Sequence, residues 1–235
     1  MCIRDSRVLR RGGQQAAVSD TCLAILGDAQ ARRLPNIEKA IASVHGAWAG
    51  TPDVQNRAAQ ILSLVCRDPA YEPRLRAALQ RFSKLPVDIP RVFDTGIPVV
   101  NKLPTRHWVS FFLARTLGNL RDARSVPELI ALLESSAPEA AAGRPDPLGP
   151  GVLFLHNDLT PCWRAEVAWA LGCLGDARAL PVLLKLIANL ENATDTRYAA
   201  AIAAGRLADA SGLAELHRLA QDYPEISVRR ALLKR

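Results

Sequence analysis

Apolar residues recur at steps of three and four along most of this chain, and this spacing predicts α-helices with one buried face. The clearest stretch is residues 163–190, WRAEVAWALGCLGDARALPVLLKLIANL. Two apolar faces follow one another in it: first Val167, Ala170, Leu171 and Leu174, then Leu180, Leu183, Leu184, Ile187 and Leu190. A helix cannot bury such a face alone, so both helices need neighbours.

The residues between the two faces predict a turn. Gly172 and Gly175 weaken the first helix and allow a positive backbone angle at its end. Asp176 is a turn former and a helix-start signal. Pro181 falls in the first turn of the second helix, where a missing N–H group costs little. The stretch therefore predicts a helical hairpin.

The hairpin recurs along the chain. LGNLRDARSVPELIALL, from Leu117, aligns without a gap on LGCLGDARALPVLLKLI, from Leu171. AGRLADASGLAELHRLA, from Ala204, is a third copy, and weaker copies surround Asp68 and Asp28. Residues 225–234 resemble the first helix of a further unit. Repetition of this kind predicts a stacked helical solenoid, so the expected fold class is all-α, with about five repeats over residues 14–235 and a start, residues 1–13, outside the array.

The shared pattern A-x-x-A-L-G-x-L-G-D-x-R-A-L-P-x-L resembles the short HEAT repeats of the phycobilisome-lyase type. The resemblance implies a superhelix of antiparallel helix pairs and leaves the activity open, because the family includes chromophore lyases, a hydroxylase, DNA-repair glycosylases and many scaffolds. The hydroxylases use His-Glu dipeptides as iron ligands. Here the four histidines are followed by Gly46, Trp108, Asn157 and Arg218, which disfavours that activity.

Two proline-rich insertions interrupt the repeat. The interval from Asp176 to Asp209 is that of a plain repeat, whereas the intervals from Asp68 to Asp122 and from Asp122 to Asp176 are equal and each longer. The extra residues fall at about 83–106 and 135–160, between the second helix of one unit and the first helix of the next. In a solenoid this places both insertions at one edge, and long insertions in compact arrays usually carry function.

We expect the insertions and the helix starts beside them to form one binding patch. Aromatic side chains with polar neighbours at a loop-lined edge are typical binding anchors. The candidate residues are Phe93, Asp94, His107, Trp108, Phe154, His156, Asp158 and Trp163. The alternative is that these aromatic residues only fasten the loops onto the solenoid.

Candidate chemistry is sparse. No CxxC, HxxxH or HExxH spacing supports a metal site, and we expect neither a metal nor a cofactor. Cys162 and Cys173 are three helical turns apart on one helix, about 16 Å, which is too far for a disulfide. Cys22 and Cys66 are expected to be small buried residues. This cysteine usage fits a reducing compartment such as the cytoplasm.

The net charge of +7 raises nucleic acid as a partner. The outward stripe of the second helices argues against it, because its expected members are mixed. Six residues after each aspartate they are Arg74, Glu128, Val182 and Glu215; nine residues after, they are Ala77, Ala131, Lys185 and Arg218. No apolar run reaches the roughly 20 residues that a membrane span needs.

The two ends of the sequence suggest a fragment. MCIRDS can be translated from a transposase adapter used in sequencing libraries, so we expect Met1–Ser6 to be a scar; the alternative is a genuine disordered start. At the other end, Ile226, Val228 and Leu232 or Leu233 are expected to lack a partner helix, which predicts self-association or poor solubility.

Two classes of function remain. The first is a non-catalytic binding or scaffold module that mediates protein–protein interaction as part of a larger protein. The second is an accessory or lyase-like domain of an enzyme, with a small-molecule site under the insertions. The first is favoured because the sequence shows no acid–base or nucleophile constellation. A full-length gene that encodes a neighbouring catalytic domain would favour the second.

Overall fold

The computed structural model describes residues 12–43, 54–84, 105–136 and 163–233, and all regular structure in these ranges is helical. The fold class is therefore all-α, as the apolar spacing predicts. The described residues divide into two compact units, one up to Leu120 and one from Arg121 onward. Each unit has its own core of leucine, isoleucine, valine and alanine side chains.

In the first unit, the helix α3 (Val54–Val65) packs between α1 (Gly12–Ile25) and α5 (Thr105–Leu120). The helix α4 (Glu72–Lys84) follows the short 3₁₀ helix η2 (Pro69–Tyr71) and packs along α5, while α2 (Pro35–Ser43) contacts α1 and α3. The centre of this core consists of leucines that are at most 1% exposed: Leu23, Leu62, Leu75, Leu113 and Leu117.

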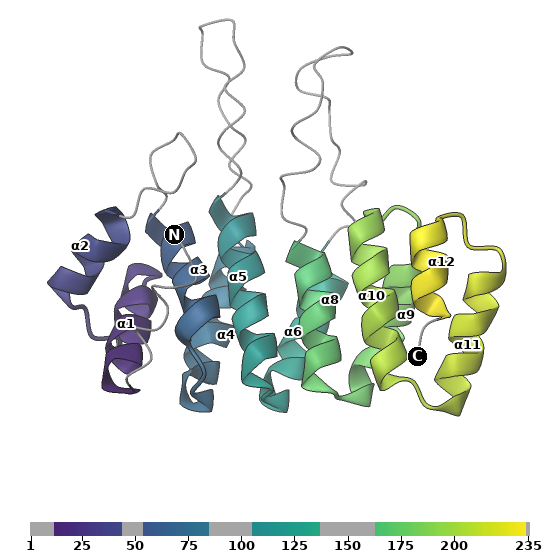
Figure 1. Cartoon of the computed structure of the whole chain (residues 1–235), viewed down its shortest axis with the longest axis horizontal. Helices are drawn as coiled ribbons and strands as arrows, with labels where there is room; N and C mark the ends of the chain where they lie inside the picture. Colours follow the sequence, from purple (N-terminus) through teal and green to yellow (C-terminus); the bar gives the residue numbers. More distant parts are fainter. Residues whose placement is uncertain (1–11, 44–53, 85–104, 137–162, 234–235) are drawn as a thin grey trace, which may run out of the picture. The chain divides into compact units, whose positions relative to one another are not determined.

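The second unit contains η3 (Ala123–Ser125), α6 (Val126–Ser135), α8 (Trp163–Leu174), η4 (Ala177–Ala179), α9 (Leu180–Ala188), α10 (Thr194–Leu207), α11 (Ala210–Gln221) and α12 (Ile226–Leu232). The first helices of successive repeats, α8, α10 and α12, lie side by side (Figure 1). The second helices α9 and α11 both pack against α10. This arrangement of antiparallel pairs with neighbouring pairs in contact is that of an α-solenoid.

The repeated aspartates cap the turns between the paired helices. The side chains of Asp68, Asp122 and Asp176 each accept a hydrogen bond, of 2.9–3.0 Å, from the backbone N–H two residues later, at the start of a 3₁₀ turn. Asp28 makes the same contact with the N–H of Gln30. Asp209 differs: it accepts from the N–H of Gly212 at 2.8 Å and starts α11 directly, without a 3₁₀ turn.

The two glycines of the central hairpin have different roles. Gly175 has the expected positive φ of +74° at the end of α8. Gly172 is buried within the helix, and its φ is not positive. A Cβ atom at Gly172 would lie 2.8 Å from the Cβ and 2.9 Å from the Cα of Ala203 in α10. The prediction that Gly172 serves helix termination is therefore wrong: it allows α8 and α10 to approach closely.

Some exposure predictions also fail. The apolar spacing places Leu190 on the buried face of the second helix, but Leu190 follows the end of α9 and is 57% exposed. Val182 is expected on the outward stripe, yet it is 4% exposed, beside the buried Leu183. Arg74, from the same stripe, pairs with Asp20 and Asp28 of α1 and the turn that follows it. The positions nine residues after each aspartate are exposed, as predicted.

The terminal helix α12 is better covered than its sequence suggests. Val228, Ala231 and Leu232 are buried against α10 and α11, whereas Ile226 and Leu233 remain 57% and 55% exposed. Part of the apolar face expected to lack a partner is thus buried within the second unit.

Candidate binding edge

The two ends of the helix pairs in the second unit are built differently. At one end, short aspartate-capped turns join the first helix of a repeat to its second helix. At the other end, the chain passes from one repeat to the next, from α9 to α10 and from α11 to α12. We call this second end the junction edge and define it as residues 189–198 and 222–226. The two segments are adjacent because side chains of one bond to the other.

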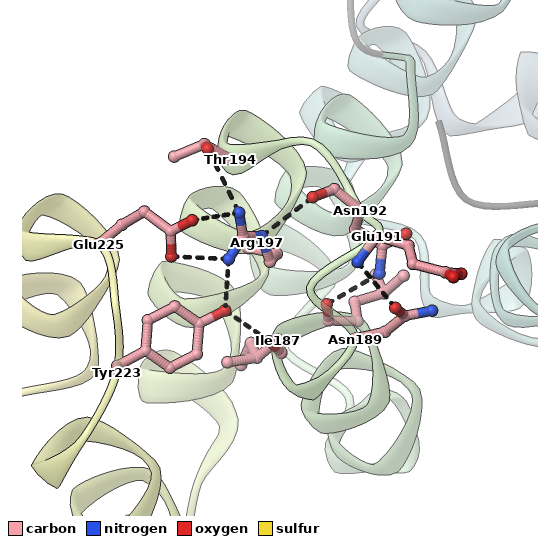
Figure 2. A network of polar contacts seen from close by, with 9 residues as sticks. Ile187, Asn189, Glu191, Asn192, Thr194, Arg197, Tyr223 and Glu225 are labelled. Carbon is pink, nitrogen blue, oxygen red and sulfur yellow. Dashed lines mark hydrogen bonds and ion pairs between the residues drawn. The ribbon is translucent and has the colours of Figure 1, made fainter. Parts of the chain in front are cut away.

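Arg197 in the first turn of α10 holds the junction edge together (Figure 2). Its side chain is 5% exposed and forms a bidentate ion pair with Glu225, with N–O distances of 2.5 and 2.7 Å. Its Nε donates to the carbonyl oxygen of Asn192 at 3.0 Å. Planar guanidinium groups suit such multiple contacts. One side chain therefore ties together the segments on both sides of α10.

Tyr223 extends this network into α9. Its hydroxyl accepts a hydrogen bond of 3.2 Å from Arg197 Nη1 and donates one of 2.5 Å to the carbonyl oxygen of Ile187 (Figure 2). Burial raises the pKa of Tyr223, so the phenol stays a donor. The hydrogen bond from Arg197 lowers the pKa of Glu225, so this carboxylate stays charged. The network is thus held in one protonation state at neutral pH.

An equivalent arginine occupies the preceding repeat. Arg164, in the first turn of α8, precedes Arg197 by the same interval that separates Asp176 from Asp209, and it is 4% exposed. Its Nη1 donates to the carbonyl oxygen of Ser136, just after α6, at 3.3 Å. In both repeats, a buried arginine at the start of the first helix bonds a carbonyl of the chain that leaves the preceding second helix.

These arginines are not among the predicted site residues, although the sequence carries a signal for them. Alignment of the repeats by the aspartates also aligns the two arginines. Tyr223 and Glu225 have no counterpart in this register, and only the structure reveals them.

The exposed face of the junction edge combines apolar and acidic side chains. Leu190, Tyr198 and Ile226 are 57%, 45% and 57% exposed. Leu190 also lines a shallow, open groove of about 260 Å³, together with Ala188, Arg218, Leu219, Asp222, Tyr223 and Pro224. Three exposed carboxylates belong to the same edge, namely Glu191, Asp195 and Asp222.

Most of the predicted patch lies outside the described residues: Phe93, Asp94, Phe154, His156 and Asp158. Positions 107 and 108 fall in the first turn of α5, but the structure does not describe the side chains of His107 and Trp108. Trp163 is the first residue of α8, next to Arg164, and is partly buried. The contiguity of this patch therefore stays a prediction.

Two of the described cysteines have buried thiol groups that are poorly suited to nucleophilic catalysis. Cys22 and Cys66 are buried, as expected, and burial raises their pKa values to about 12 and about 11. Both stay protonated at neutral pH, so neither is a ready nucleophile. In the part of the chain that the structure describes, no three His, Cys, Asp or Glu side chains are grouped as metal ligands. No described helix has the length and apolar character of a membrane span.

The fold and the edge define an α-helical repeat protein, and family models identify the repeat. A model of HEAT repeats matches residues 153–234, and a model of the PBS lyase HEAT-like repeat matches residues 112–135. These matches support HEAT repeats in residues 112–135 and 153–234, as the resemblance of the hairpins implied.

Comparison with individual proteins adds little to this assignment. No curated protein matches the chain. Among solved structures, human deoxyhypusine hydroxylase in complex with glycerol matches with 17% identity and a TM-score of 0.37, over 97% of this chain and 80% of that one. At that TM-score the likeness carries no argument about function.

Proposed function

We propose that this protein is a non-catalytic HEAT-repeat module that binds another protein or protein domain at the edge where one repeat passes to the next. The observation that carries the proposal is the contrast between the two ends of the helix pairs. One end consists of short capped turns. The other, in the second unit, carries three exposed apolar side chains together with three exposed carboxylates, and the helices that flank the insertions in the sequence end or begin at this kind of connection.

The aspartates at the turn end offer little to a partner, although one exposed apolar side chain, that of Leu64, lies near this end in the first unit. The aspartates are occupied by backbone N–H groups, and Asp122 and Asp176 also pair with Arg124 and Arg178. The carboxylates are only 16% and 18% exposed. A partner that bound there would have to replace these internal contacts, at a cost in stability.

The junction end offers more. Leu190, Tyr198 and Ile226 expose apolar surface on a backbone that Arg197 holds fixed. Surface with an apolar centre and polar surroundings is typical of protein interfaces. The sequence places Trp108 and Trp163 at the starts of α5 and α8, where the insertions rejoin the helices, and tryptophan is enriched among the residues that dominate binding energy.

Affinity capture with tagged protein tests this proposal. The wild-type chain is expected to capture a defined protein from a lysate of the source organism, identified by mass spectrometry and then purified. Trp108→Ala and Trp163→Ala should each reduce the affinity for the purified partner at least tenfold without unfolding the protein.

Leu64→Ala is the matched control. Leu64 is an exposed apolar residue near the end of α3, at 64% exposure, on the side of the aspartate turns. Its truncation should leave the affinity unchanged. Unchanged affinity in both folded tryptophan variants would contradict the proposed binding edge.

A further inference from the structure

The groove at the junction edge of the second unit has a chemistry that selects a partner. Its floor and walls include the aliphatic side chains of Leu190 and Leu219, the ring of Pro224 and part of Tyr223. It is shallow and open, whereas small-molecule sites enclose most of the ligand surface. A groove of this form suits a short segment of polypeptide that inserts one or two apolar side chains.

Asp222 lines the groove, Glu191 follows the lining residue Leu190, and Asp195 lies in the first turn of α10. Glu191, Asp195 and Asp222 are exposed, and none of them forms an ion pair within the described ranges. Arg218 is the cation that lines the groove, and it is already bound to Glu215 through two hydrogen bonds of 2.7 and 2.8 Å. Carboxylates without cationic partners attract positive charge, which also raises the rate of encounter with a basic partner.

The walls of the groove are fixed before a partner arrives. Residues 189–192 and 222–225 lie on opposite sides of Arg197, which bonds Asn192 and Glu225 and also Tyr223. Tyr223 in turn is anchored to Ile187. A surface that is already ordered loses less conformational entropy on binding. The network therefore supports the groove without using the three exposed carboxylates.

We infer that this groove binds a basic peptide segment, in which leucine-like side chains are flanked by lysine or arginine. The apolar side chains occupy the groove beside Leu190 and Pro224, and the basic side chains pair with Glu191, Asp195 and Asp222. The inference rests on the proposed binding function and adds the chemical class of the partner. It does not depend on the tryptophans of the insertion-bearing starts of α5 and α8.

Fluorescence anisotropy with synthetic peptides tests the inference. A short labelled peptide with two leucines flanked by lysine and arginine should bind the full chain, and its affinity should fall as salt is raised. Replacing its leucines by serine, or its basic residues by glutamate, should abolish binding. The combined variant Glu191→Gln, Asp195→Asn and Asp222→Asn should bind the basic peptide about tenfold more weakly.

The matched control changes the net charge by the same amount elsewhere. Ala77→Lys, Gln80→Lys and Ala131→Lys also add three positive charges, at exposed helical positions. This variant should bind almost as well as wild type. Leu190→Ser provides a second test that leaves the carboxylates intact, and it should weaken binding several-fold. Thermal melting of each variant confirms folding.

Several outcomes would overturn the inference. One is that the wild-type protein fails to bind the basic peptide, and another is that both charge variants lose affinity for it equally. Binding that is unchanged in the variant without the three carboxylates and in Leu190→Ser would also contradict it. Self-association of the chain in sedimentation that Leu190→Ser removes would also overturn it, because a second copy would then occupy the groove. If tryptophan-dependent capture persists while the basic peptide fails to bind, only the peptide class is wrong and the binding function stands.

Discussion

The local backbone conformation, or the close packing of two helices, determines which residue is favoured at several positions of the repeats. Arg121 has a positive φ of +55°, which is unfavourable for a side chain with a Cβ atom. The corresponding residue of the next repeat is Gly175, with a φ of +74°. The two repeats therefore use the same left-handed turn before Asp122 and Asp176, and only one of them has the residue that favours it.

Arg121→Gly is expected to stabilise the protein by up to about 1 kcal/mol, because it removes the strain of a non-glycine residue in the left-handed region. The reciprocal change Gly175→Ala should destabilise by about 1 kcal/mol. Urea unfolding of both variants measures these differences. A destabilised Arg121→Gly protein would show that the arginine side chain has a role the backbone does not explain.

Gly172 illustrates the other use of glycine. In Gly172→Ala, the new methyl group would collide with the backbone and the side chain of Ala203, so α8 and α10 must separate. We expect a loss of about 1–3 kcal/mol, typical of overpacking in a close contact. Gly13→Ala in α1 is the control, because no atom lies within 4 Å of its new methyl group. If the two variants have the same thermal stability, the close approach of α8 and α10 at Gly172 is contradicted.

Leu183 lies at the centre of the second unit and is fully buried in α9. Leu183→Ala should cost about 2–5 kcal/mol, since it removes buried methyl groups and leaves a cavity. Lys185→Ala, two residues later on the exposed side of the helix, should change stability by less than about 0.5 kcal/mol. If Leu183→Ala lowers the free energy of unfolding in urea by less than about 1 kcal/mol, the side chain does not lie on the buried face of α9.

The contacts between elements depend on Arg197, which connects α9, α10 and the start of α12. Its partner Glu225 has a pKa below its ordinary value, because the guanidinium group donates hydrogen bonds to the carboxylate. The folded-state pKa thus lies below the unfolded value of about 4.3. The contact contributes stability that is fully present above that value and is lost as the pH falls through the folded-state pKa.

Glu225→Gln should therefore destabilise the protein by about 1–2 kcal/mol at pH 7, because a neutral amide makes weaker hydrogen bonds to a buried guanidinium group. The difference from wild type should shrink steadily below about pH 4 and vanish once the wild-type carboxyl group is protonated. Chemical unfolding at a series of pH values measures it. A difference that does not depend on pH would mean that Glu225 acts through packing and not through its charge.

The sequence predicts the helices and their pairing well, because each depends on local patterns. The helix α8, the Asp176 turn and α9 follow from apolar spacing, a glycine, an aspartate and a proline within a single hairpin. The close approach at Gly172 and the contact between Arg197 and Glu225 join different helices. No local pattern identifies such partners, so these contacts were not predicted.

The candidate site shows the same limit. Sequence reasoning directs attention to the aromatic residues near the insertions, because long loops and tryptophans are conspicuous. The groove at Leu190 and Asp222 consists of two short connections that belong to successive repeats. The apolar spacing assigns Leu190 to a buried face, since helical periodicity does not indicate where a helix ends. Only the packing of α9 beside α11 brings the two connections together.

At the scale of the whole molecule, the chain contains HEAT repeats, and the two ends of the helix pairs in the second unit differ. This difference follows from the repeat itself. In the second unit, the turn within a pair is short and capped by an aspartate, while the connections from α9 to α10 and from α11 to α12 expose apolar and acidic groups. We propose that binding takes place at the second end.

Hydrogen exchange of the full chain, with and without the purified protein obtained by affinity capture, locates the binding surface. Binding is expected to slow exchange at the starts of α5, α8 and α10 and in residues 189–193 and 222–226. Exchange at the turns that follow Asp68, Asp122 and Asp176 should be unchanged. Protection confined to those turns, with none at the helix starts, would contradict the account.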